Sequence, residues 1–237
     1  MNEDDPFDLL DVIGEFPLAA GAFAEMRRYV KAVAQFSDHV GSQTVVRLGA
    51  QLRRVRDPVS EAELEYEIEV ARRDAETTIP RVIWGSVLVA IYATYETGVR
   101  NALMFWNEKV AGSARFNSRQ EGGFLKSASE YARSEIGVEL FTDEGTREIV
   151  YELRTLRNSF AHATGEMPQR KGELHRALLS AQSRGIEVTV VEGAWIASPR
   201  CAVRYLLFVE RTYKQFADKV IERYLVARRG GPTSASS

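Results

Sequence analysis

The feature that most constrains the fold is one long apolar segment in the middle of the chain. Helical spacing predicts a single helix from residue 81 to 110, and the run from Val82 to Tyr95 contains no charged residue. A helix that is apolar nearly all round is buried by neighbours on every side. The uncharged run ends at Glu96 and is shorter than a bilayer-spanning helix requires. The segment is therefore expected to form the centre of a helical bundle.

Helical spacing of apolar residues recurs on both sides of this segment. Further helices are expected at residues 17–40, 60–78, 124–135, 143–163, 171–183 and 199–228. An alternating stretch at 186–190 is followed by the turn Glu192-Gly193, and residues 194–198 are expected to return as a second strand, which predicts a β-hairpin. We therefore predict an all-α fold, an antiparallel helical bundle with a small β-hairpin before the last helix. The central pair of helices is expected to be 81–110 and 143–163.

Local signals predict where these helices begin and end. Ser60 with Glu63 forms a capping box at the start of one helix. Pro80 is expected to break or kink the helical pattern, and Thr142 is expected to cap the helix that follows it. The stop signals after that helix are Gly165 and Pro168.

Three regions follow from this pattern. Residues 1–58 are predicted to be an N-terminal helical extension, and residues 59–228 the main helical domain. Residues 229–237 are small and polar, and we expect them to be disordered. The segment 60–78 is rich in glutamate and is expected to be a solvated helix, or one that packs only along Leu64, Ile68 and Ala71.

Composition excludes several function classes. The 237 residues carry a net charge of −2, so no global basic field indicates nucleic-acid binding. The single cysteine, Cys201, forms no internal disulfide, and the three histidines have no metal-binding spacing. We expect no metal and no cofactor. The acidic N-terminus does not resemble a secretory signal, which predicts a cytoplasmic protein without a membrane segment.

The segment Leu156 to His162 concentrates the chemistry of the chain. Arg157 is a permanent cation that can hold a phosphate, and histidine readily exchanges a proton near neutral pH. On a helical wheel, Asn158 and His162 share a face roughly opposite the stripe Ile149, Leu153, Leu156 and Phe160. Arg157 lies about 140° from His162, so one straight helix does not bring the two together.

The order Arg157, Asn158, three residues and His162 on a late core helix resembles the HEPN domains, an all-helical superfamily. Its pattern is an Arg, four to six residues and a His, commonly with Asn directly after the Arg. The segment Ile91 to Asn101 also looks like the buried helix that often precedes the motif helix. The resemblance spans roughly residues 82–224 and marks 59–228 as a HEPN-like domain.

The resemblance implies a metal-independent endoribonuclease, because many HEPN proteins act so in toxin–antitoxin, abortive-infection and CRISPR systems. His162 is expected to act as general base or acid, Arg157 to stabilise phosphate charge, and Asn158 to hold His162 or the phosphate. The expected partners are RNA, a second copy of the chain, and an antitoxin or nucleotidyltransferase. Because Arg157 and His162 diverge on one helix, we expect a homodimer that faces two motif helices across a two-fold axis.

Other interpretations stay open at this stage. The motif fits a non-catalytic HEPN-like interaction module, or a chance occurrence in a helical protein. Arg157 could instead form a salt bridge to Glu148, Glu152 or Glu96. Glu96 interrupts the apolar helix and needs a partner if buried. Glu96 could pair with Arg100 on the same helical face or with Arg157 across the bundle. We also consider an auxiliary role for Glu96 in the site. Four arginines at 47, 53, 54 and 56 steer RNA in one interpretation and form a solvated loop in the other.

Overall fold

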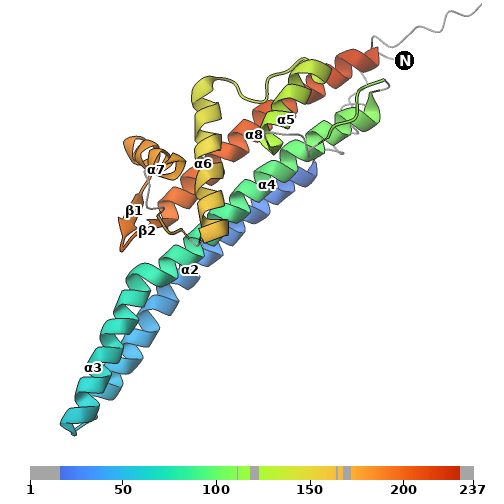
Figure 1. Ribbon diagram of the computed structural model, residues 1–237. Coiled ribbons are helices and arrows are strands. Elements are labelled where there is room, and N and C mark those ends of the chain that lie inside the picture. The colour runs from blue at the N-terminus through green and yellow to red at the C-terminus, as the bar shows by residue number, and fades with distance from the viewer. Residues whose placement is uncertain (1–16, 111, 118–122, 164, 168–171, 230–237) are drawn as a thin grey trace, which may run out of the picture. The chain divides into compact units, whose positions relative to one another are not determined.

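The predicted fold class is confirmed by the computed structural model, which describes residues 17–110, 112–117, 123–163, 165–167 and 172–229 (Figure 1). Of the described residues 80% are helical, in seven α-helices, and an antiparallel two-stranded hairpin lies directly before the long last helix. In chain order the elements are α2 (Pro17–Leu52), α3 (Pro58–Arg73), η1 (Asp74–Thr78), α4 (Ile79–Lys109), α5 (Phe124–Tyr131), η2 (Ala132–Ile136), α6 (Glu144–Ala163), α7 (Glu173–Ser183), β1 (Val188–Val191), β2 (Ala194–Ala197) and α8 (Pro199–Arg229).

The start of the glutamate-rich helix α3 differs from the sequence prediction. Asp57 is the N-cap residue, and its carboxylate accepts hydrogen bonds from the backbone N–H and the hydroxyl of Ser60 at 2.9 and 2.8 Å. Pro58 occupies the first helical position, where its missing N–H costs nothing. The predicted capping box at Ser60 and Glu63 is therefore wrong, because the Asp-Pro pair begins the helix earlier. α2 likewise continues to Leu52, beyond its predicted end at residue 40.

The expected break at Pro80 is absent, and one continuous helix runs from Pro58 to Lys109. The chain accommodates the proline with a π-helical turn, η1, directly before it. The backbone N–H of Ile79 bonds to the carbonyl of Asp74, five residues back instead of four. Proline clashes with the carbonyl four residues before it in a regular helix, and the wider π turn occurs just where that clash would arise.

By length and composition alone, the helix Pro58–Lys109 is long and apolar enough to cross a membrane, although half of its most apolar window is buried within the protein. The core helix of a bundle passes the same test, so this is weak evidence for a membrane segment. The buried side chains of its apolar half are Trp84, Val87, Leu88, Ile91, Tyr92, Tyr95, Val99, Ala102, Leu103 and Trp106. Burial of this extent agrees with the central position expected from the sequence.

The described helices form two compact units, to which α2, α4, α6 and α8 all contribute. One unit comprises residues 17–25, 92–150 and 207–229, and the other 26–91 and 151–206. In the first unit, Phe23 contacts Tyr213 with ring centroids 5.5 Å apart. The second unit contains the motif residues of α6, together with α7 and the hairpin. The first 16 residues and most of the predicted disordered tail lie outside the described residues.

The hairpin forms where the alternating pattern predicted it. β1 pairs with β2 in the register Val188↔Ala197 to Val191↔Ala194, and the turn residues Glu192 and Gly193 have φ values of 51° and 77°. Two residues with positive φ are typical of the tight turns that match strand twist. Glu192 is an unusual residue in this conformation, and its carboxylate forms an ion pair with Arg73 at the end of α3.

Candidate functional site

The motif helix α6 begins at a cap formed by Asp143. Its Oδ1 accepts a 2.7 Å hydrogen bond from the backbone N–H of Thr146, and this bond is the main reason that the pKa of Asp143 lies below its ordinary value. Thr142, the predicted cap, donates its hydroxyl to Asp143 instead. The prediction is wrong by one residue, because an ionised carboxylate accepts more strongly than a hydroxyl at a helix N-terminus.

The apolar face of α6 is buried as its spacing predicted. Leu153 and Leu156 have no exposed surface, while Phe160 is half-buried. The Phe160 ring lies beside the indole of Trp195, with centroids 6.3 Å apart. A Cβ added to Gly85 of α4 would lie 2.1 Å from the Phe160 ring, so backbone and ring are in direct contact. The end of the motif helix is thus held against α4 and β2.

The three motif residues all keep some contact with solvent. His162 is exposed in the last turn of α6, while Arg157 and Asn158 are half-buried. Nη1 of Arg157 donates a 2.8 Å hydrogen bond to Oδ1 of Asn158. Among the described residues, the imidazole of His162 makes no hydrogen bond or ion pair, and the amide nitrogen of Asn158 makes none either. In the structure Asn158 therefore orients Arg157. The sequence analysis expected Asn158 to hold His162 or the phosphate instead.

The carboxylate of Glu152, one of the acids considered as an Arg157 partner, is engaged elsewhere. It is 5% exposed and accepts hydrogen bonds from the Tyr205 hydroxyl of α8 and from Arg184, which follows α7. Burial raises the pKa of Glu152, against the opposing effects of the Tyr205 hydrogen bond and the Arg184 charge. Glu152 therefore ties α6 to the ends of two other helices, a role that nothing in the local sequence signalled.

Cys201, the one cysteine, lies near this buried carboxylate and is fully buried. Burial raises the pKa of Cys201 to about 12, and the charges of Glu152 and Glu187 add to the effect. Only the thiolate is an effective nucleophile. Cys201 is therefore packed as a small core residue, with its thiol protonated at neutral pH.

The hairpin holds the C-terminal end of α6. Gly165 follows the helix with a φ of 81°, and its N–H reaches the carbonyl of Ser159. The carbonyl of Gly165 accepts from the backbone of Trp195 at 3.0 Å. The indole N–H of Trp195 donates to Oγ of Ser159 at 3.1 Å. Gly165 is confirmed as a stop signal, whereas Pro168 lies outside the described residues.

Glu96, the auxiliary candidate, belongs to the other unit. Its Oε1 accepts a 3.2 Å hydrogen bond from Arg100, four residues later on α4. This confirms the pairing on the same helical face that the sequence offered as one choice. The Arg100 guanidinium also lies over the ring of Phe124, 5.3 Å from its centroid. Glu96 thus has a local structural partner.

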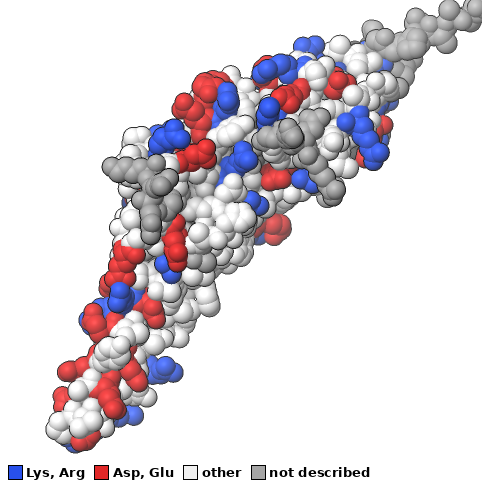
Figure 2. Space-filling view, viewed as in Figure 1, with Lys and Arg blue, Asp and Glu red and all other residues white. Residues whose placement is uncertain are grey.

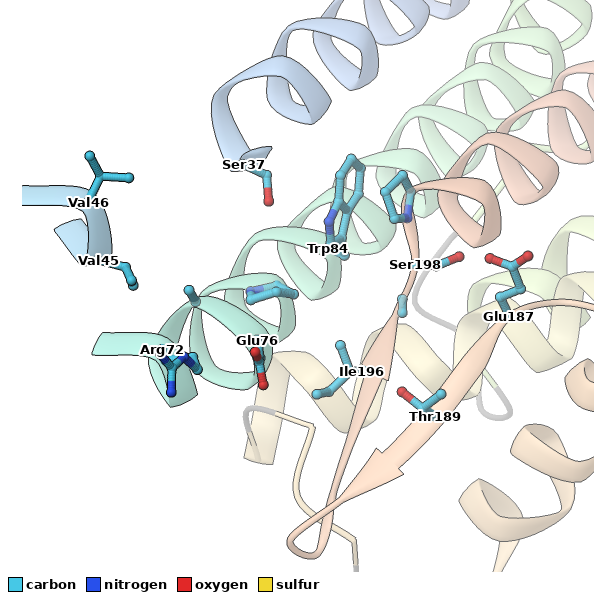
Figure 3. A pocket seen from close by; sticks show the side chains of 14 residues that line it. Ser37, Val45, Val46, Arg72, Glu76, Trp84, Glu187, Thr189, Ile196 and Ser198 are labelled. Atoms are coloured by element: carbon cyan, nitrogen blue, oxygen red, sulfur yellow. The ribbon is translucent and has the colours of Figure 1, made fainter. Parts of the chain in front are cut away.

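The cavity shown in Figure 3 lies in the second unit and does not include the motif residues. It has a volume of about 790 Å³, and its lining includes Trp84 of α4 and Ile196 and Thr189 of the hairpin. None of the three motif residues is among the described residues that line it. Within the described ranges, no group of three or more His, Cys, Asp or Glu side chains is placed to hold a metal ion.

The face of the protein that Figure 2 shows carries charges of both signs. Figure 2 shows Lys and Arg interspersed with Asp and Glu over the visible face.

Comparisons with protein-family models, with curated proteins and with solved structures found no match. The likeness to HEPN domains therefore rests on the sequence alone.

Proposed function

We propose that the protein is a metal-independent endoribonuclease of the HEPN type, acting as a toxin or phage-defence effector. The observation that carries the proposal is the arrangement at the end of α6. The Arg157 guanidinium is oriented by Asn158, and the exposed imidazole of His162 follows on the last turn. A fixed cation beside a proton-exchanging group is what phosphodiester cleavage needs.

The reaction is an attack of the RNA 2′-oxygen on the adjacent phosphorus. His162 takes the proton of the 2′-hydroxyl, and the P–O5′ bond breaks. The 5′-oxygen leaves with a proton from solvent water, and the protonated His162 then returns its proton to solvent. Arg157 and the amide N–H groups of Asn158 stabilise the charge on the phosphate oxygens. The products are a 2′,3′-cyclic phosphate and a 5′-hydroxyl.

The test is cleavage of single-stranded RNA by the purified protein in excess EDTA. His162→Ala is expected to lower the cleavage rate by about 100-fold or more, the usual contribution of a general acid–base group. Arg157→Ala is expected to have a similar effect. The matched controls are His175→Ala on α7 and Arg147→Ala in the first turn of α6, since neither residue has a role in the reaction. Circular dichroism checks that all four variants keep their helical content.

A second candidate, a non-catalytic HEPN-like interaction module, is favoured by one observation. The His162 imidazole has no orienting partner among the described residues, whereas catalytic histidines are usually held by a hydrogen bond. A wild-type protein that leaves diverse RNAs intact, or motif variants that cleave as well as the controls, would support this module instead of the nuclease.

A further inference from the structure

A second cavity, of about 340 Å³, lies between the π-turn region and the hairpin. Ile196 of β2 lines both this cavity and the one in Figure 3. The volume of the second cavity is at the small end of the range for ligand pockets. The residues that line it are Val70, Arg73, Asp74, Thr77, Thr78 and Arg81 on the helical side, and Val191, Glu192, Ala194 and Ile196 on the hairpin side.

The charges of this cavity are distributed unevenly. Arg73 forms its ion pair with Glu192. The hydrogen bond that Arg73 donates to Glu192 is the main cause of the raised pKa of Arg73, with a smaller contribution from Asp74. Both acids therefore act on one cation. Arg81 lies eight residues further along the same helix, about 12 Å along its axis. This distance places the second cation away from the Arg73–Glu192 pair.

Within the described residues, the Nε atom of Arg81 has no hydrogen-bond acceptor. The Arg81 side chain is half-buried, and its Nε atom is buried. In the part of the chain that the structure describes, Arg81 forms no ion pair. A buried donor without an acceptor is unfavourable, and more so when it carries charge. The π turn, which ends at Thr78 three residues before Arg81, is a second indication, because π segments occur frequently at functional sites.

We propose that this cavity binds a small organic anion, whose carboxylate or phosphate group accepts hydrogen bonds from Arg81. The planar guanidinium can hold either group through two parallel N–H bonds. The apolar body of the ligand lies against Val70 and Ile196. The site contains none of the motif residues, so the proposal does not depend on the proposed nuclease activity.

Thermal unfolding with three ligands that share one aromatic body tests the site. Benzoate carries a carboxylate, phenyl phosphate carries a phosphate, and neutral benzamide carries neither. At millimolar concentration and constant ionic strength, at least one anion is expected to raise the Tm of the wild type, while benzamide does not. Whichever anion acts identifies the group that Arg81 recognises.

Variants then assign the effect to Arg81. Arg81→Ala is expected to weaken binding of the active anion by about tenfold or more, because hydrogen bonds to a charged group are lost. Arg81→Lys keeps the charge but loses the planar fork, and should weaken binding less. Arg72→Ala is the matched control, because Arg72 lines the other cavity. If Arg81→Ala fails to fold, the comparison of Arg81→Lys with Arg72→Ala decides.

Three results would overturn the site. These are equal stabilisation by benzamide, no stabilisation by either anion, and binding that is as tight in the folded Arg81 variants as in the Arg72→Ala control. Each of them can occur whether or not the protein cleaves RNA. Weakened binding in the Arg81 variants together with unaltered RNA cleavage would support an anion site that is separate from the nuclease.

Discussion

The indole N–H of Trp195 donates a 3.1 Å hydrogen bond to the hydroxyl of Ser159, linking the hairpin to the motif helix across 36 residues of sequence. Ser159 lies directly after Asn158, and Trp195 is 1% exposed. The position of the motif residues thus depends on a strand that follows them in the chain. Nothing in the sequence pattern around Ser159 or Trp195 indicates that the two residues form a pair.

Removing the Ser159 hydroxyl should destabilise the protein. Ser159→Ala leaves the buried indole N–H without an acceptor, at an expected cost of about 1–2 kcal/mol in the free energy of unfolding. Urea denaturation measures the change. Ser86→Ala is the control, because the exposed Ser86 hydroxyl bonds only to a carbonyl of its own helix, and it should be close to neutral. Equal midpoints for the two variants would show that the Trp195 contact contributes nothing.

Gly85→Ala should displace the end of the motif helix. The added methyl group would meet the Phe160 ring at 2.1 Å, and overpacking of this kind costs about 1–3 kcal/mol. Gly49→Ala is the matched control, since nothing lies within 4 Å of its Cβ position in α2. It should stabilise the protein by about 0.5–1 kcal/mol, because alanine favours a helix interior. Thermal unfolding of both variants should therefore shift in opposite directions.

Glu152 should make the free energy of unfolding fall as pH rises. A carboxylate in an ordinary salt bridge has the opposite effect, because its pKa is lowered. Burial raises the pKa of Glu152 above its ordinary value of 4.5, so the folded state binds its proton more tightly than the unfolded state. Its contribution to stability is complete below pH 4.5 and is lost as pH rises through the folded-state pKa. Relative to Glu152→Gln, the wild type should lose stability as pH rises from 4.5. A wild-type advantage that grows with pH would contradict the raised pKa.

Mixing two inactive variants tests whether two copies build the catalytic site. If Arg157 of one copy acts with His162 of another, a mixed dimer of Arg157→Ala and His162→Ala contains one intact site of two. Random exchange of subunits should then restore about a quarter of the wild-type activity. Light scattering should show a dimer. A monomer at micromolar concentration that still cleaves RNA would defeat the dimer model and leave the fold unaffected.

The candidate site was only partly predictable from the sequence. Residue order and the helical wheel placed Asn158 and His162 on the accessible face of α6 and buried Leu153 and Leu156. The wheel could not show that Asn158 would bond to its neighbour Arg157, because rotamers depend on the packed surroundings. The partners of Glu152 come from residues 184 and 205, and no local pattern relates them to it.

The sequence by itself determined the elements: the all-α class, the hairpin with its Glu192-Gly193 turn, and the apolar core of the central helix. These follow from local spacing and turn chemistry, which act between residues a few positions apart. Only the tertiary structure decided that a π turn carries the helix past Pro80, that Trp195 holds Ser159, and that Glu152 joins three helices. The bonds of Ser159 and Glu152 depend on contacts between residues far apart in the chain, whereas the π turn is a local response to Pro80. Packing and the need to pair buried polar groups select such contacts, which local periodicity does not record.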